Sequence, residues 1–177
     1  MVKIEDGKGR GFSAEVTDEQ HLSVDATTDK RVSHESREHG RAFVWTSTFG
    51  TGTTDVEVLY IKNTSTTRNL FIDSMRYSAS AACIFSVFKH TGTATGTAIT
   101  GENLNFTSSN DPEATSLGNG AVTAGTIGNA IAFMQVGANS DSNRNWNGEV
   151  ILGEGDSIIV TASANATVHL AITGFFE

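Results

Sequence analysis

Two histidines and two glutamates stand close together near the start of the chain, in the segment HESREH from His34 to His39. Imidazole and carboxylate groups are common zinc ligands. The two histidines are five residues apart. This spacing puts them on opposite faces of a strand and about 140° apart around an α-helix. Neither geometry brings the two rings together, so the spacing favours a solvated charge cluster and predicts no metal site.

A second candidate for ion binding is the alternation of Asn139, Asp141 and Asn143, which has the order of oxygen ligands in a calcium loop. An EF-hand also needs a glycine at its sixth position and an acidic residue at its twelfth. Those positions hold Arg144 and Val150. Because Asn, Asp and Ser favour turns, the segment is better explained as a polar turn.

The search for catalytic motifs is negative. The segment GKGRG at 7–11 follows only a short apolar island and opens no helix, so it is expected to be a charged turn and not a phosphate-binding loop. The sequence contains no nucleophile elbow and no P-loop. Sequence alone cannot place two carboxylates at the separation that glycoside hydrolysis needs. We therefore expect no enzymatic activity, no cofactor and no small-molecule substrate.

Composition indicates an all-β protein. The 177 residues include 40 Thr and Ser but only seven Leu, so strong helix formers are scarce. The net charge of −8 argues against general nucleic-acid binding. No apolar run approaches the roughly 20 residues of a membrane-spanning helix, and the start of the chain does not resemble a secretory signal, so no membrane partner is expected. The single cysteine, Cys83, lies in an apolar run and is expected to be buried.

Charge divides the chain at residue 41. Residues 1–41 contain seven Lys or Arg and nine Asp or Glu, and their apolar residues form short, separated islands. This pattern predicts an extended N-terminal arm over 1–41 that contacts a neighbouring chain. The candidate contact residues are the apolar and basic side chains of this segment: Ile4, Lys8, Arg10, Phe12, Val16, Leu22, Val24, Arg31, Arg37 and Arg41.

The rest of the chain, residues 42–177, shows apolar residues at period two between clusters of Gly, Asn, Thr and Ser. This pattern predicts eight or nine strands in an antiparallel β-sandwich of jelly-roll type, with an immunoglobulin-like sandwich as the alternative. Phe85, Phe88 and Phe133 are expected in the core. Two polar stretches, 107–128 and 137–148, are predicted to be loops. Trp146 lies in the second loop, either as a lid on the sandwich or as an exposed contact residue.

Short motifs resemble those of tailed-bacteriophage virion proteins, in particular jelly-roll capsid decoration (cement) proteins. DGKGRGFSAEV followed by HLSVDA resembles the arm that precedes the body in such chains. LYIKN at 59–63, EVILGEGDSIIVTASA at 149–164 and the ending AITGFFE resemble steps of their body strands.

The resemblance implies a non-enzymatic structural protein that cements the capsid by binding across subunits of the major capsid protein. It also implies a homotrimer and a place on the virion surface after synthesis in the host cytoplasm. The alternative is a tail- or fibre-associated module that recognises a host glycan or receptor through its loops.

Overall fold

The computed structural model describes residues 15–16, 22–23, 31–125 and 127–177 of the chain. The chain divides into two compact units, Met1–Lys30 and Arg31–Glu177. In the first unit the strands β1 (Glu15–Val16) and β2 (Leu22–Ser23) pair antiparallel, with Val16 opposite Leu22. The second unit begins ten residues before the end of the predicted arm, because residues 31–39 are helical and not extended.

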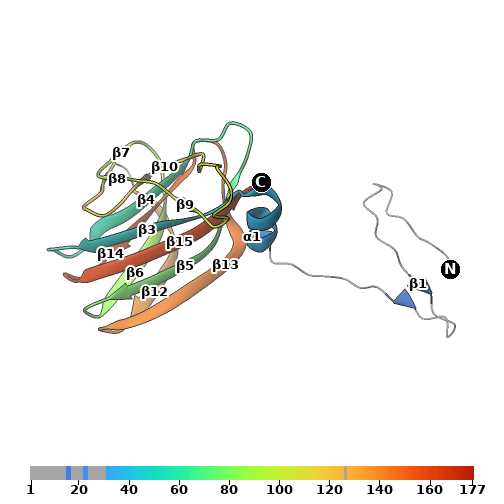
Figure 1. Cartoon of the computed structure of the whole chain (residues 1–177). Coiled ribbons are helices and arrows are strands. Elements are labelled where there is room, and N and C mark those ends of the chain that lie inside the picture. The colour runs from blue at the N-terminus through green and yellow to red at the C-terminus, as the bar shows by residue number, and fades with distance from the viewer. Residues whose placement is uncertain (1–14, 17–21, 24–30, 126) are drawn as a thin grey trace. The chain divides into compact units, whose positions relative to one another are not determined.

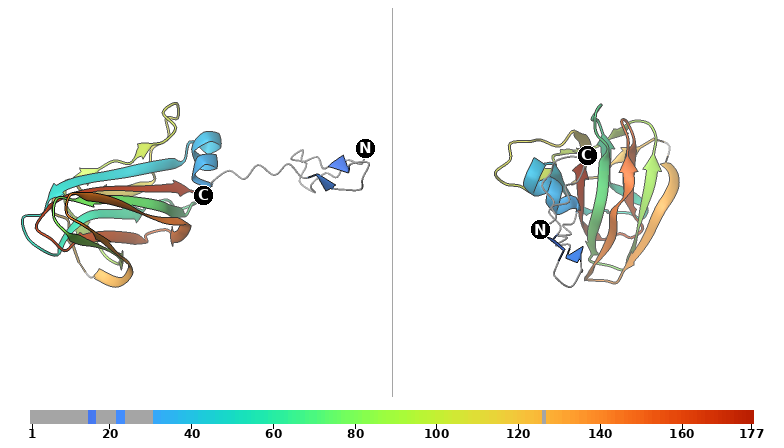
Figure 2. Two further views of the ribbon diagram at one scale, coloured as in Figure 1. Left: turned by 90° about the horizontal axis from the view of Figure 1, so that it is seen from below. Right: turned by 90° about the vertical axis from the view of Figure 1, so that its right-hand side faces the viewer.

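The second unit is a sandwich of two antiparallel sheets (Figures 1 and 2). Among the described residues, eight strands are six residues or longer. They are β3 (Ala42–Gly50), β4 (Val56–Asn63), β5 (Leu70–Ala79), β6 (Cys83–His90), β12 (Ile127–Val136), β13 (Ser140–Leu152), β14 (Ser157–Ala162) and β15 (Thr167–Phe176). The shorter strands of this unit are β7 (Ala94–Thr95), β8 (Ala98–Ile99), β9 (Glu102–Asn103), β10 (Ala114–Leu117) and β11 (Thr123–Ala124).

The order of the long strands is that of a jelly roll. One sheet has the order β12-β6-β14-β4-β10-β8, and the other has the order β13-β5-β15-β3-β9. Successive long strands change sheet at every step except from β6 to β12, so each sheet contains strands from distant parts of the chain. This interleaving of two four-stranded sets confirms the predicted all-β sandwich and its jelly-roll type.

The core lies between the two sheets and follows from strict alternation along the strands. On β15, Val168, Leu170 and Ile172 are buried while Thr167 and His169 are exposed. A smaller apolar cluster around Tyr60 and Ile159 lies apart from this core. Partly buried residues from the segments that carry β7 and β11 pack against it. These segments thus give the six-stranded sheet an additional apolar cover.

Some expectations about single residues hold and others fail. Phe85 and Cys83 are buried as predicted, and Phe88 is half-buried. The prediction for Phe133 is wrong, because its side chain is 71% exposed on β12. Strict alternation explains this: the neighbours Ala132 and Met134 point toward the core, so Phe133 points away from it.

The predicted loop 137–148 is for the most part strand β13. Its turn-forming residues make a bulge instead of a loop: the register with β5 shifts between Asn145 and Val150, and Asn147 and Gly148 have positive φ angles of 51° and 79°. Trp146 lies inside this bulge and is 5% exposed, so it packs in the core and is not a surface contact residue. The predicted loop 107–128 contains β10, β11 and the start of β12.

Candidate functional site

A short helical segment lies at one end of the sandwich, beside the C-terminus (Figure 1). It consists of one α-helical turn, α1 (Arg31–His34), followed by one π-helical turn, η1 (Glu35–His39). Gly40 ends the segment in the left-handed conformation, with φ 58° and ψ 40°. Glycine is the usual residue for this position because it has no Cβ to strain it.

Arg31 attaches the beginning of this segment to the sandwich. Its guanidinium Nη2 lies 2.5 Å from the Oε2 of Glu177 and 5.2 Å from the centre of the Phe71 ring. Phe71 in turn stacks on Phe175, with ring centres 5.2 Å apart and planes 4° apart. The sequence predicts that Arg31 contacts a neighbouring chain. Its charge is paired with Glu177 of its own chain, and its side chain is 58% exposed.

Three asparagines hold the other end of the segment. Asn105 Nδ2 donates to the carbonyl of Ser36 at 3.0 Å, and Asn110 Nδ2 donates to the carbonyl of His39 at 3.0 Å. Asn103 Nδ2 donates to the carbonyl of Gly40 at 2.8 Å. The last carbonyls of a helix commonly lack a partner within the helix, and these side chains supply hydrogen bonds there. The carbonyl of Ser36 also accepts from the amide of Gly40 at 3.1 Å. We call Asn103, Asn105 and Asn110 the asparagine clamp.

Gly40 adopts the left-handed conformation and also packs closely against Ser108. A Cβ placed on Gly40 would lie 2.3 Å from the Oγ of Ser108, far inside van der Waals contact. Ser108 follows the first two asparagines of the clamp in the same loop. The helical segment and the polar loop are therefore fitted to each other, and these contacts hold the backbone of η1 against the sandwich.

The π-helical turn brings His34, Glu35 and His39 together. The two imidazole rings meet edge to face, with centres 5.5 Å apart and planes 84° apart. One ligand atom from each of the three residues lies within 4.8 Å of the others. Both histidines are exposed, whereas Glu35 is 5% exposed and its Oε2 has no hydrogen-bond partner. We call these three residues the His-Glu-His cluster.

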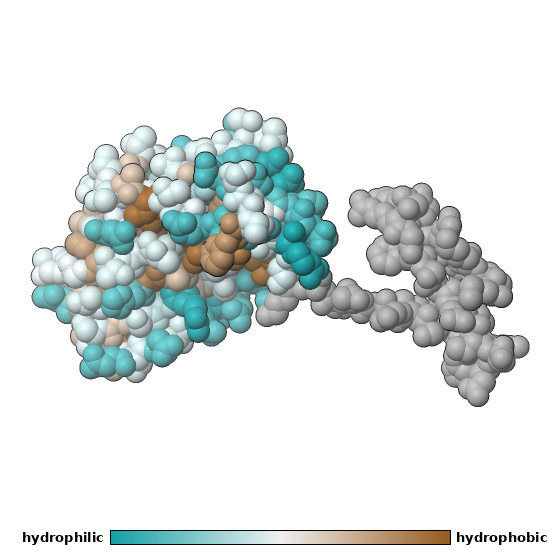
Figure 3. Space-filling model, viewed as in Figure 1, coloured by the Kyte–Doolittle hydropathy of each residue, from teal (hydrophilic) through white to brown (hydrophobic). Residues whose placement is uncertain are grey.

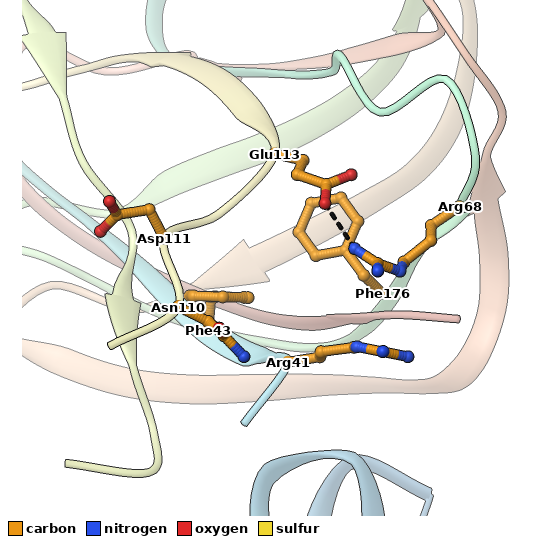
Figure 4. Close-up of a pocket in the computed structure, with 7 residues that line it drawn as sticks. All are labelled: Arg41, Phe43, Arg68, Asn110, Asp111, Glu113 and Phe176. Carbon is orange, nitrogen blue, oxygen red and sulfur yellow. Dashed lines mark hydrogen bonds and ion pairs between the residues drawn. The ribbon is translucent and has the colours of Figure 1, made fainter. Parts of the chain in front are cut away.

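A small cavity lies close to the clamp, between the start of β3 and the loop before β10 (Figure 4). It has a volume of about 170 Å³. Its lining consists of Arg41, Phe43, Arg68, Asn110, Asp111, Glu113 and Phe176. Arg68 and Glu113 form an ion pair across it, which neutralises their charges. Pockets for small molecules generally measure about 300–1,000 Å³, so this cavity is small for a substrate.

Exposed apolar side chains gather on another part of the sandwich. Phe133 is 71% exposed, and Ile131 and Ile84 are each about two-fifths exposed. The first two lie on β12, which is the edge strand of its sheet, and Ile84 lies on the adjacent strand β6. We call these three residues the β12 patch. On the face of the molecule seen in Figure 3, apolar residues are scattered in small patches among polar ones.

The predicted contact residues fall into three groups. Arg31, Arg37 and Arg41 belong to the second unit, where Arg37 Nε lies 3.2 Å from Glu38 Oε1 and Arg41 lines the cavity. Val16 and Leu22 lie in the β1–β2 pair of the first unit. The others lie outside the described residues: Ile4, Lys8, Arg10, Phe12 and Val24.

No family model, no curated protein and no solved structure matches this chain. None of the described helices is long and apolar enough to cross a membrane.

Sequence reasoning missed the two features that define this end of the molecule. It did not consider a π-helical turn, which is rare, and so it separated two histidines that the structure brings together. It also treated the asparagines of the loop as ordinary turn formers. A signal was present: Gly40 follows a run of charged residues, as a helix-ending glycine does.

Proposed function

We propose that this chain is a non-enzymatic structural protein of a tailed-phage virion, which decorates the capsid by binding across neighbouring subunits of the major capsid protein. One observation carries the proposal. The chain divides into two compact units, and the described core residues of the sandwich lie between Ala42 and Phe176 of the second unit. We assign the contacts with another chain to the first unit, which is a separate compact unit of the chain.

The β12 patch supports a role in assembly. An exposed edge strand with large apolar side chains is a surface that pairs readily with a second chain. Phe133 also makes an edge-to-face contact with Phe88, with ring centres 6.4 Å apart, which holds the exposed ring in place. We assign this patch to contact with a second copy of the chain, in keeping with the proposed homotrimer.

The first unit would attach the body to the shell. Lys8 and Arg10 would contact acidic capsid surface, and the β1–β2 pair would offer an outer edge for strand addition. Exposed ion pairs each contribute at most about 1 kcal/mol, so firm attachment needs several copies acting together. Arg31 stays a candidate contact residue, because its side chain is 58% exposed although Glu177 of the same chain pairs with it.

The test is a truncation at the boundary between the two units. Residues 31–177 should unfold cooperatively at nearly the same temperature as the full chain, since the core is unchanged. The truncated chain should no longer co-sediment with expanded capsids that lack the protein, whereas the full chain should. A full-length variant with Lys8→Ala and Arg10→Ala tests the charges separately. Equal decoration by the truncated and full-length chains would refute the proposed attachment.

The tail- or fibre-associated binding module remains the alternative proposal. It no longer has Trp146 as a contact, because that ring is buried. It would instead use the small polar cavity, where Asn110 and Asp111 come from the predicted loop 107–128. Reproducible binding on a glycan array that Asp111→Ala abolishes, without binding to capsids, would favour this alternative over decoration.

A further inference from the structure

The His-Glu-His cluster owes its geometry to the π-helical turn. In a π-helix each hydrogen bond joins residue i to residue i+5, so side chains five apart stack on the same face. His34 immediately precedes the π-helical turn and His39 ends it, five residues later. A spacing of five residues separates two rings on a strand or an α-helix, but in this π-helical turn it brings the rings of His34 and His39 into contact. Single π-helical turns inside helices occur frequently at functional sites.

Glu35 supplies an independent observation. Its side chain is almost completely buried, and its Oε2 has no hydrogen-bond partner. A buried carboxylate oxygen without a partner is costly, because water no longer solvates it and nothing in the protein replaces that water. In proteins, an ion pair or coordination to a metal ion usually compensates the cost of burying a carboxylate. The imidazoles of His34 and His39 each place a ring nitrogen within 4.8 Å of a carboxylate oxygen of Glu35. A neutral imidazole carries no charge, but one of its ring nitrogens can coordinate a metal ion.

We propose that His34, Glu35 and His39 bind a divalent transition-metal ion of the zinc type. Two imidazole nitrogens and one carboxylate oxygen are a ligand set that suits Zn²⁺, whereas Mg²⁺ and Ca²⁺ prefer oxygen ligands throughout. Three protein ligands leave a fourth position for water or for a group from another molecule. This proposal does not rest on the proposed function, because none of the three residues belongs to the β12 patch or to the first unit.

The side chains can close on an ion with small movements. Zinc bonds of about 2.0–2.2 Å in a tetrahedron set ligand atoms roughly 3.3–3.5 Å apart. The three ligand atoms now lie within 4.8 Å of one another, so each pair must approach by at most about 1.5 Å. Both histidines are exposed and can rotate, while Glu35 is held by burial. The buried carboxylate is the fixed ligand and the two imidazoles close onto it.

The backbone beneath the cluster is already in place. Asn110 holds the carbonyl of His39, Asn105 holds that of Ser36, and the amide of Arg41 donates to the carbonyl of Glu35 at 3.0 Å. Ligands on a fixed backbone lose less conformational freedom on binding than ligands on a mobile one. An ion at this position would join α1 to η1 and stabilise the helical segment against opening.

The test uses the full chain, purified without a histidine tag, and zinc chloride as the probe. Isothermal titration should show one zinc ion per chain, and the temperature of unfolding should rise with zinc concentration, because a ligand that binds only the folded state stabilises it. Magnesium chloride at the same concentration should leave the unfolding temperature unchanged. Absence of zinc binding by the full chain would overturn the proposal.

Variants distinguish this site from adventitious binding. His34→Ala and His39→Ala should each weaken zinc binding by about tenfold or more, since the site keeps only two ligands. Glu35→Gln should do the same while keeping the shape of the side chain. His169→Ala is the matched control, because His169 is an exposed histidine on β15, outside the cluster. Zinc affinity that persists in any of the first three variants, or falls equally in the control, would contradict the assignment.

Discussion

His90 is a buried titratable residue with a defined set of partners. It ends β6, and its Nδ1 lies 3.2 Å from the hydroxyl of Ser157 on β14, which itself donates to the His90 carbonyl. The Tyr60 ring on β4 meets it edge to face at 5.4 Å. Burial, and to a smaller extent the positive charge of Lys62 on β4, lowers the pKa of His90 below its ordinary value of 6.5. The folded protein thus favours the neutral ring.

This lowered pKa predicts acid sensitivity. Above about pH 6.5 His90 is neutral in both states, and its contribution to stability is complete. As the pH falls below that value, the unfolded chain takes up the proton first, so the free energy of unfolding decreases until the folded pKa is passed. His90→Gln should remove up to about 1.4 kcal/mol per pH unit from the slope of this free energy just below about pH 6.5, where the unfolded chain has taken up the proton and the folded protein has not.

Chemical denaturation at a series of pH values measures that slope. His169→Gln is the control, because His169 is exposed on β15 and faces solvent. The comparison uses the slope and not the absolute stability, since any change at a buried position also alters packing. Identical slopes for the parent chain and His90→Gln would show that His90 does not titrate differently in the two states.

Phenylalanines show what the sequence could predict about single residues. Phe85 and Phe133 both lie in apolar runs, and the sequence predicts both in the core. Alternation gives two faces but does not say which face of a strand points inward when both carry apolar residues. On β12 the inward face carries small or flexible residues, Ala132 and Met134, so the larger ring of Phe133 is left outside. That choice depends on the opposing sheet, which no local pattern contains.

At the scale of elements, the asparagine clamp is expected to decide whether the helical segment stays closed. Asn105→Ala and Asn110→Ala each remove a hydrogen bond to a helix carbonyl, which costs about 0.5–1.5 kcal/mol. The amides of Gly40 and Arg41 donate back into this segment. Their hydrogen exchange should accelerate about three- to tenfold in either variant, because local opening becomes easier.

The matched control for the clamp is Asn143→Ala, since Asn143 is exposed on β13 and distant in sequence from the helical segment. Exchange in the core strand β15 should not change in any of the three variants, which separates local opening from global unfolding. Unchanged exchange at Gly40 and Arg41 in both clamp variants would mean that the segment is held by something else.

The elements themselves were predicted unevenly. Long alternating runs such as those of β4 and β15 were recognised, because period two is a strong signal for a half-buried strand. The sequence predicts a loop at 137–148, where β13 has its bulge, because Asn and Gly favour turns and bulges alike. The helical segment was missed because nine residues with charges on all sides carry no apolar period. Its fold comes from contacts with Glu177 and the clamp, which lie far away in the sequence.

At the scale of the whole molecule, the number and spacing of the strands in the sequence predict the jelly-roll class. They do not predict which strands pair with each other. β3 and β15 are adjacent in one sheet, with Ala42 opposite Phe175 and Gly50 opposite Thr167. This pairing brings together the first and the last long strands of the sandwich. Such a pair closes a very long loop, and the contacts between the two strands must offset the entropy cost of that closure.

The position of β15 leads to a prediction about truncation from the C-terminal side. β15 lies between β5 and β3 and hydrogen-bonds to both, so its loss would leave two strand edges unpaired. It would also uncover the core residues that contact Val168, Leu170 and Ile172, each of which is at most 3% exposed. A chain ending at residue 166 should therefore show no cooperative unfolding transition in circular dichroism, although it keeps about nine-tenths of the sequence.

The truncation at the other end is the natural comparison. Residues 31–177 omit nearly three times as many residues, yet should retain the transition because every described core residue is kept. A cooperative transition in the chain ending at 166 would mean that β5 and β3 can close the sheet without β15. The sandwich would then not depend on its last strand, and the hydrogen bonds from β15 to both neighbours would contribute far less than this register implies.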